Sequence, residues 1–358
     1  MSGNQLERHY PGLAAALPCL TLGEWPTPLE ELPGLAARLG LAALAVKRDD
    51  LSSPLYGGNK LRKLEYLLPD ALASGCDAVV TYGSVGSNHA LATSVFATRL
   101  GLLSHAVLVD QPPSPAVAQK LRYLLKTGAV IHAAGSFNQT RQIFERISHS
   151  HPGGPARVCD IPWGGSSWRG AVGFVAGAFE LARQGADAGT PPPDFLYVSG
   201  GTLGTVIGLA LGLRAAGLPT RVVAPRAVPS GAGSAAHAAE QLLDTNREIH
   251  ARDASFPLFD EPLANVELRP EFYGTGYAEA TPGALEAIEL MHGQGVKLEA
   301  TYTGKAFAGL LADARSGRLA GKRVVFWNTY SSAPYPPDLD AVDLARLPAA
   351  FRHYVEGG

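Results

Sequence analysis

Short runs of β-branched and aromatic residues, each leading into a glycine-rich loop or a longer Ala/Leu-rich segment, constrain the fold of this chain most strongly. The runs lie at 78–82, 106–110, 129–132, 157–161, 195–199, 221–224 and 323–327. Mostly apolar runs of this length are typical of parallel strands covered on both faces, and the segments between them are long enough for helical crossovers. The pattern therefore predicts an α/β fold of open, twisted, mostly parallel sheets flanked by helices.

The composition indicates a small molecule as the partner. The chain has 358 residues with 46% hydrophobic content, enough to bury a large core in one big domain or two smaller ones. Its formal net charge is −2 and it has no Lys/Arg-rich run, so neither nucleic acid nor an anionic membrane is an expected partner. The apolar stretch 205–213 is too short to span a bilayer and ends at Arg214.

Cysteine use and the N-terminal residues suggest where such a chain works. Cys19, Cys76 and Cys159 are widely separated and form no CxxC pattern, which argues against a disulfide framework and against a zinc site. We therefore expect free thiols in a reducing compartment and no metal. The first residues lack a basic segment followed by an apolar one, so we expect no signal peptide and a cytoplasmic location.

The glycine-rich loop SGGTLGT, at 199–205, lies between a predicted strand and a predicted helix. Its glycines let backbone N–H groups come close to an anion, and the N-terminus of the following helix favours negative charge. The loop has neither the lysine of a Walker A sequence nor the GxGxxG of a dinucleotide site. It predicts a phosphate site without a nucleotide, although a helix entry that serves packing alone has the same pattern.

Lys60 stands at the start of a strongly helical segment, in YGGNKLRKLEYLL at 56–68. A lysine forms a Schiff base with an aldehyde cofactor when its amine is neutral, so burial or nearby cations must lower its pKa. Arg62 and Lys63 are close enough in sequence to contribute. The alternative is a solvated basic helix face, which is the more common environment of lysine.

Two further loops place polar side chains where they can meet a ligand. GSVGSNH, at 83–89, presents Ser87, Asn88 and His89 in succession after two glycines, and helix capping explains only one of them. In ATYTGKAFAGLL, Tyr302 precedes a predicted helix. A tyrosine beside a cofactor acts as an acid or base when its pKa is lowered, but a lone tyrosine is more often packed with its hydroxyl bonded.

Together these segments resemble the 1-aminocyclopropane-1-carboxylate deaminase / D-cysteine desulfhydrase family, a branch of the tryptophan synthase β-like (fold type II) pyridoxal-phosphate enzymes. The resemblance covers about 27–331 and is carried by KRDD, GGNK, RKLE, SNH, IPWGGSSWRG, SGGTLGT, GYAEAT and YTGK. The order KRDD, GGNK, RKLE and then SNH is more specific than any single glycine loop. The resemblance implies a homodimeric lyase that binds pyridoxal 5′-phosphate and acts on a small amino acid.

The resemblance also implies a role for each matching residue. Lys60 corresponds to the Schiff-base lysine, and Asn88 to the asparagine that hydrogen-bonds the ring hydroxyl of the cofactor. The implied catalytic residues are Lys60, Ser87, Tyr277 and Tyr302, with Lys60 or Tyr302 removing the Cα proton. The implied substrate-binding residues are Ser87, Asn88, His89 and Tyr277. The implied phosphate cradle is made by backbone N–H groups of Gly200, Gly201, Thr202 and Gly204.

Thr303 and Thr329 are the implied partners of the cofactor's pyridine nitrogen. Thr303 stands where the deaminases have a glutamate, as in the desulfhydrase branch. A glutamate keeps that nitrogen protonated and makes the ring a strong electron sink, whereas a hydroxyl leaves the sink weaker. Opening a cyclopropane that has no removable Cα hydrogen should need the stronger sink. The threonine therefore favours β-elimination, such as conversion of D-cysteine to pyruvate, ammonia and sulfide.

Two departures from the family pattern leave the substrate open. Asn328, Thr329, Tyr330 and Ser331 stand where the family commonly has HTGG, and Gly86 replaces the usual glutamine before SNH. The alternatives are 1-aminocyclopropane-1-carboxylate deamination and a specialised β-elimination or β-replacement on another β-substituted amino acid. A non-catalytic α/β module that binds a phosphorylated metabolite is the alternative from another class.

The predicted architecture has two domains with the cofactor between them. Residues 1–62 plus 169–358 are expected to form the large, cofactor-binding domain, and 63–168 the small one, with the tail from Pro334 wrapping the surface. The segment WGGSSW, with Trp163 and Trp168, is expected either to face the active site or to pack as a turn.

Overall fold

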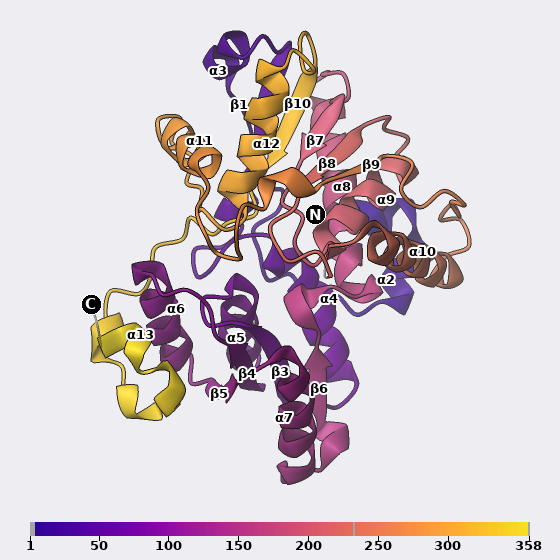
Figure 1. Cartoon of the computed structure of the whole chain (residues 1–358). Coiled ribbons are helices and arrows are strands. Elements are labelled where there is room, and N and C mark those ends of the chain that lie inside the picture. The colour runs from indigo at the N-terminus through magenta and orange to yellow at the C-terminus, as the bar shows by residue number, and fades with distance from the viewer. Residues whose placement is uncertain (1–3, 232, 357–358) are drawn as a thin grey trace.

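The computed structural model describes residues 4–231 and 233–356, which form two sheets flanked by helices (Figure 1). This confirms the predicted α/β class with mostly parallel strands. Among the described strands, β1 pairs antiparallel with β2, and the other pairs are parallel. Over the same residues, no helix combines the length and the apolar character needed to cross a bilayer.

The larger sheet runs in the order β1-β2-β10-β7-β8-β9. Its strands are β1 Leu29–Glu31, β2 Ala43–Lys47, β7 Phe195–Tyr197, β8 Arg221–Pro225, β9 Val266–Arg269 and β10 Arg323–Trp327. Neighbouring residues pack on opposite faces: Leu196 and Val222 join one core, whereas Tyr197 and Val223 join another. Both faces are covered, which explains the uninterrupted apolar runs. Sequence analysis missed β1, β2 and β9, because they are short, alanine-rich or half polar.

Helices from distant parts of the chain cover the two faces of this sheet. One face carries α1 Gln5–His9, α2 Pro11–Ala16, α8 Trp168–Asp187, α9 Gly204–Ala215 and α10 Ala235–Arg252. The other carries α3 Pro33–Arg38, α11 Pro282–His292 and α12 Thr303–Arg315. The glycines of α9 allow close packing on α8, since a Cβ at Gly208 would lie 2.3 Å from the Ala171 carbonyl oxygen.

The smaller sheet runs in the order β5-β4-β3-β6. Its strands are β3 Ala78–Ser84, β4 Leu103–Val109, β5 Val130–Ala134 and β6 Val158–Ile161. One face packs against α4 Lys60–Ala73, α5 Asn88–Arg99 and α6 Pro115–Lys126, and the other against α7 Phe137–Ser150. The helix α4 also reaches the larger sheet's core through Tyr66, so it joins the two parts of the molecule.

The expectation of free thiols is wrong for two of the three cysteines. Cys76 and Cys159 form a disulfide with their Cα atoms 5.9 Å apart, and Cys19 is free. Cys76 lies just before β3, and Cys159 lies in β6 opposite Val79. The two thiols become neighbours because β3 and β6 pair in parallel, and a spacing of 83 residues gives no sign of that.

The C-terminal tail packs on the smaller sheet's side of the molecule. Leu339, Phe351 and Tyr354 belong to the core formed by α4, α5 and α6, and α13 His353–Glu356 lies beside α6 (Figure 1). The predicted division assigned this tail to the large domain, and its contacts are with the small one. After β10 the chain therefore crosses back and binds the smaller part.

Candidate active site

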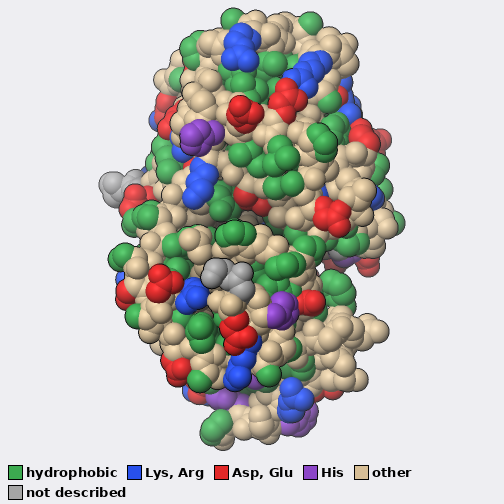
Figure 2. Space-filling model, turned by 60° about the vertical axis from the view of Figure 1, so that its left-hand side comes forward, with side chains coloured by type: hydrophobic (Ala, Val, Ile, Leu, Met, Phe, Trp, Pro, Cys, Tyr) green, Lys and Arg blue, Asp and Glu red, His purple; other side chains and the backbone are tan. Residues whose placement is uncertain are grey.

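A cavity of about 480 Å³ lies where both sheets present loops and helix starts. Loops that follow β3, β7 and β10 line it, as does the start of α4, so it lies at the carboxyl ends of parallel strands. The predicted site residues that line it are Lys60, Ser87, Asn88, His89, Gly201, Thr202, Tyr277, Tyr302 and Thr329. Gly200, Gly204 and Thr303 are not among the lining residues. Figure 2 shows a hollow across the middle of one face, with hydrophobic side chains at its edges.

Lys60 is the first residue of α4, and its side chain opens onto the cavity. The turn before it needs glycine, because Gly58 has φ +97° and a Cβ there would lie 2.6 Å from the Tyr330 carbonyl oxygen. The Lys60 amine has no hydrogen bond or ion pair with any described residue, and burial lowers its pKa to about 8. A substantial fraction of this amine is therefore neutral near physiological pH.

Arg62 does not lower the pKa of Lys60, although its closeness in sequence suggested that it would. Arg62 turns away from the cavity and donates to Asp49 at 2.8 Å and to Glu180 at 3.0 Å, so it is neutralised by two carboxylates. Lys60 owes its lowered pKa to desolvation rather than to Arg62. The helix α4 thus separates a paired cation on one side from an unpaired amine on the other.

The loop 199–205 presents open backbone donors at the start of α9. The N–H groups of Gly201, Thr202 and Leu203 have no acceptor among the described residues, and Leu203 has φ +63°. The Gly200 N–H donates to the Pro225 carbonyl at 2.8 Å, and the Gly204 N–H donates to the Thr202 carbonyl at 2.9 Å. The donors available to a ligand are therefore those at the centre of the loop.

Lys63 places a buried amine beside these donors. Its Nζ donates to the Gly164 carbonyl at 2.9 Å and to the Ser166 hydroxyl at 3.0 Å, and it has no acidic partner in the described ranges. Burial, together with the charge of Lys60, holds its pKa well below the usual value. It lies against the first turn of α9, since a Cβ at Gly204 would be 3.0 Å from this Nζ. A buried amine beside open amides suits an anion such as phosphate, because a bound anion favours the protonated form of the amine.

The residues of SNH start α5 at the cavity wall. The Ser87 hydroxyl accepts from the Ala90 N–H at 3.2 Å and caps the helix. The Asn88 Oδ1 accepts from the Tyr56 hydroxyl at 2.9 Å, which leaves the amide NH₂ free to bind a ligand. Burial and the charges of Lys60 and Lys63 hold the pKa of His89 well below its usual value, so this imidazole is neutral.

Gly86, one of the two departures from the family pattern, has a structural reason. Its N–H donates to the Gln111 Oε1 at 3.0 Å, and a Cβ at Gly86 would lie 2.9 Å from the Gln111 Nε2. The Gln111 amide therefore fills the space that a side chain at position 86 would need. Lys120 also donates to the Gly86 carbonyl, at 3.0 Å, and this bond helps to fix the loop.

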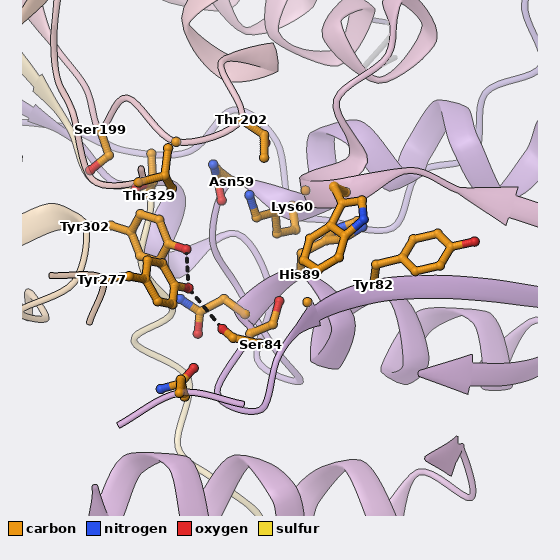
Figure 3. Close-up of a pocket in the computed structure, with 18 of the residues that line it drawn as sticks. Asn59, Lys60, Tyr82, Ser84, His89, Ser199, Thr202, Tyr277, Tyr302 and Thr329 are labelled. Atoms are coloured by element: carbon orange, nitrogen blue, oxygen red, sulfur yellow. Dashed lines mark hydrogen bonds between the residues drawn. The ribbon is translucent and has the colours of Figure 1, made fainter. Parts of the chain in front are cut away.

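Three hydroxyls form a chain on one wall of the cavity. The Tyr277 hydroxyl lies 2.7 Å from that of Tyr302 and 3.1 Å from that of Ser84 (Figure 3). Burial raises the pKa of both tyrosines, so both hydroxyls stay protonated at neutral pH. Tyr302 also packs on the loop at 199–205, because a Cβ at Gly201 would be 3.6 Å from its ring. Sequence reasoning missed Ser84, which only the strand end of β3 brings to this place.

Thr303 is buried, and its hydroxyl is used within the protein. The Thr303 hydroxyl accepts from the Glu299 N–H at 2.9 Å, and the Glu299 carboxylate accepts from the N–H groups of Tyr302 and Thr303. Glu299 lines the cavity and caps α12, and sequence reasoning did not select it. Its carboxylate accepts from the first N–H groups of the helix, which is a favourable place for an acidic side chain.

The other departure from the family pattern, at 328–331, lies in the segment that follows β10. Thr329 and Tyr330 line the cavity, and the Tyr330 ring lies 5.6 Å from the Lys297 ammonium. The Ser331 hydroxyl accepts from the Gly57 N–H at 3.0 Å, next to the glycine turn before Lys60. The Tyr330 side chain therefore narrows the cavity, and Ser331 ties the segment after β10 to the turn before Lys60.

Comparison with known proteins gives consistent results. Residues 20–329 match the family described as pyridoxal-phosphate dependent enzyme. A putative 1-aminocyclopropane-1-carboxylate deaminase of Pyrococcus horikoshii is 34% identical over 88% of this chain and 93% of its own. A D-cysteine desulfhydrase of Klebsiella pneumoniae is 32% identical over 88% and 94%, and a nocardicin C-9′ epimerase of Nocardia uniformis is 34% identical over 90% and 98%. The crystal structure of an ACC deaminase homologue superposes with a TM-score of 0.77 at 28% identity, covering 97% of this chain and 100% of the other.

Proposed function

This chain belongs to the family of pyridoxal-phosphate dependent enzymes, and we propose that it uses Lys60 to carry the cofactor and cleaves a β-substituted amino acid by β-elimination. The observation that carries this proposal is the Lys60 amine, which has no partner among the described residues and a pKa lowered to about 8 inside the cavity. An amine that is neutral near physiological pH is able to attack an aldehyde.

The chain's own residues fit the remaining parts of the cofactor. The open N–H groups of Gly201, Thr202 and Leu203, together with the buried Lys63 amine beside them, suit the phosphate. The free amide NH₂ of Asn88 suits the ring hydroxyl. We assign the ring nitrogen to the Thr329 hydroxyl rather than to Thr303, since Thr303 is turned into the cap of α12.

When bound, pyridoxal phosphate withdraws electrons from the α-carbon of an amino acid and so weakens the bond to its proton. We assign removal of that proton to the Lys60 amine. The tyrosine hydroxyls are poor bases, because burial raises their pKa, whereas Lys60 titrates at about 8. Of the two residues that the resemblance implies for this step, Lys60 and Tyr302, we therefore favour Lys60.

Tyr302, Tyr277 and Ser84 are proposed as the proton-donating side of the site. Their hydroxyls form a continuous chain with separations of 2.7 Å and 3.1 Å, so a proton given up at Tyr302 can be replaced from Tyr277. Such a chain suits protonation of a departing group such as a thiolate. The N-terminus of α5, with the Ser87 hydroxyl and the neutral His89, is proposed to hold the substrate carboxylate.

Thr303 supports elimination over ring opening. No carboxylate occupies position 303, and the carboxylate of nearby Glu299 accepts from the N–H groups of Thr301, Tyr302 and Thr303. Desulfhydration of D-cysteine to pyruvate, ammonia and sulfide is the reaction we propose first, and relatives named D-cysteine desulfhydrase support it. Deamination of 1-aminocyclopropane-1-carboxylate is the second candidate, since relatives with that name are equally similar.

Reduction with borohydride tests the role of Lys60. The cofactor-loaded protein should retain the cofactor covalently on the peptide that contains Lys60, as measured by mass spectrometry. Lys60→Ala should lose this adduct and all turnover, whereas Lys322→Ala, which removes a cation paired with Asp194 on the surface, should keep both. An adduct on another lysine, or turnover by Lys60→Ala, contradicts the assignment.

A substrate panel then separates the two reactions. D-cysteine, β-chloro-D-alanine and L-cysteate release pyruvate by elimination, whereas the cyclopropane acid requires ring opening. We expect pyruvate from the first group and at least about 100-fold slower reaction with the cyclopropane acid, in line with a weaker electron sink. Comparable rates would favour the deaminase.

We also propose a homodimer in solution, as the family resemblance implies, and light scattering should then give twice the chain's mass.

A cytoplasmic location stays a prediction. The bond between Cys76 and Cys159 removes the free-thiol half of the reasoning behind it.

A further inference from the structure

A second wall of the same cavity is made of aromatic rings. Tyr82 of β3, Trp163 of the turn after β6 and Phe137 at the start of α7 all line the cavity. The Tyr82 and Trp163 rings are stacked with centroids 5.8 Å apart and planes 18° apart, and Phe137 lies 4.9 Å from Trp163. We call these three residues the aromatic wall.

The aromatic wall lies beside the groups that carry the chemistry. Gly164, next to Trp163, gives its carbonyl to Lys63, and a Cβ at Gly165 would lie 3.2 Å from the His89 ring. In Figure 3 Tyr82 lies on the side of His89 opposite the tyrosine pair. A side chain that extends from a substrate held near His89 away from the tyrosines would therefore meet these rings.

Packing of the protein does not account for Phe137. The side chain is 64% exposed, whereas the core-facing side of α7 is made by Ile143 and Ile147. Ser136 already caps the helix through the Gln139 N–H, so position 137 has no capping duty. Its ring nevertheless lies over Trp163 at the mouth of the cavity. An exposed ring held there is suited to contact a ligand rather than the core.

The cavity of about 480 Å³ has to hold the proposed cofactor together with the substrate. A substituent larger than that of cysteine is therefore indicated by the three rings and not by the volume. A CH₂–SH group is too small to cover three rings. An aromatic group stacks on such a wall and gains affinity beyond that from the burial of its area.

Resting on the proposed function, we propose that the aromatic wall is the side-chain subsite and that the substrate class is amino acids with an aromatic or similarly flat, bulky substituent on the β-carbon. The wall then selects the substrate, while Lys60 and the hydroxyl chain act on its α- and β-carbons. Cysteine and other small amino acids react at the same site by the same elimination but leave the wall uncovered.

Binding of phenylalanine and alanine to the cofactor-loaded protein tests the subsite. Neither amino acid carries a leaving group on its β-carbon, so calorimetry measures binding without elimination. Phenylalanine, in the enantiomer that binds better, should bind at least about tenfold more tightly than alanine. Phe137→Ala should weaken phenylalanine binding about 3- to 10-fold and leave alanine binding within about twofold.

Matched variants keep the result interpretable. Phe137→Tyr should restore phenylalanine binding, and Leu285→Ala, which removes another exposed apolar side chain, from α11, should change nothing. Equal affinity for the two amino acids, or equal effects of Phe137→Ala on both, overturns the subsite. Absence of the borohydride adduct on Lys60 instead overturns the proposed function, so the two failures are distinguishable.

Discussion

The hydroxyl chain and the aromatic wall face the same cavity but are held in different ways. Ser84, Tyr277 and Tyr302 are tied by hydrogen bonds of 2.7 Å and 3.1 Å, and Tyr302 packs on the loop at 199–205. The aromatic wall is held by ring stacking, and its outermost ring is largely exposed. Hydrogen bonds fix an atom's place within tenths of an ångström, whereas stacked rings tolerate a range of partners.

This difference suggests that the two walls have separable duties. Proton transfer requires fixed distances, and the hydroxyl chain provides them. Selection of a side chain requires shape and apolar area, and an exposed ring can change identity at little cost to folding. Loss of a hydroxyl should therefore lower the rate, while loss of a ring should lower affinity.

The largest effect is expected from Tyr302→Phe. This variant keeps the ring on Gly201 and removes the proton donor, so kcat should fall about 10²- to 10⁴-fold, the usual contribution of general acid–base groups. Phenylalanine binding should stay within about twofold of the parent protein, because the aromatic wall is untouched. The measurement is pyruvate release alongside calorimetry. A loss of affinity with unchanged kcat would show that the two duties are not separate.

The disulfide offers a control on the comparison, because it lies away from both walls. It joins Cys76, just before β3, to Cys159 early in β6, whereas Tyr82 and Ser84 lie near the other end of β3 and Trp163 follows the other end of β6. Cys76→Ala/Cys159→Ala should lower the free energy of unfolding by about 2–4 kcal/mol, as measured by urea denaturation.

In the double variant, phenylalanine binding and adduct formation at Lys60 should both stay within about twofold of the parent protein, because the bond lies away from both walls. Cys19→Ala is the control, since Cys19 is free. An intact mass that is the same before and after reduction would contradict the bond itself.

The first wall and the cofactor site were largely predictable from sequence. GGNK, SNH, SGGTLGT and YTGK are local patterns, and parallel strands bring their carboxyl ends to one edge, so Lys60, Asn88 and Tyr302 line one cavity. The strands at 78–82, 195–199 and 323–327 were predicted for the same reason. Each is a run whose two faces are both buried, and that burial leaves a clear pattern.

The second wall was not predictable, because no local pattern connects its members. Tyr82, Phe137 and Trp163 come from a strand, a helix start and a turn, and only the parallel order of the smaller sheet brings them together. The disulfide and the contact of Gln111 with Gly86 depend on the same sheet order. The use of Thr303 as a partner of Glu299 escaped prediction because helix capping and ligand binding use the same side chains.

The pH dependence of cofactor capture tests the environment of Lys60. A lysine amine reacts in its neutral form, and burial lowers the pKa of Lys60 from 10.5 to about 8. The rate at which the cofactor-free protein captures pyridoxal phosphate should rise about tenfold per pH unit below pH 8 and level off above it. A rate that keeps rising to about pH 10 would show a solvated Lys60. Phe137→Ala should leave this profile unchanged, because the aromatic wall does not touch the amine.

The smallest effect is expected from Tyr354→Phe in the C-terminal tail. The Tyr354 hydroxyl accepts from the Gln111 N–H at 3.0 Å, and its one proton has two acceptors within hydrogen-bonding distance, the Gln111 carbonyl oxygen and the Asp110 carboxylate. Gln111 in turn accepts from Gly86 in the loop that leads to Ser87, so the tail positions the part of the cavity edge next to both walls. Without the hydroxyl, the bond accepted from the Gln111 N–H and the bond made by the hydroxyl's own proton are lost.

This loss should raise KM for D-cysteine about 2- to 5-fold, since each such bond contributes about 0.5–1.5 kcal/mol and water replaces part of it. The turnover number should stay within about twofold, because the hydroxyl chain and Lys60 are not in contact with the tail. Tyr10→Phe, which alters a tyrosine packed on Phe179 and Phe256 far from the cavity, should leave both constants unchanged. A fall in kcat with KM unchanged would mean that the tail acts on the hydroxyl chain, and the separation of the two walls would then fail at the cavity edge they share.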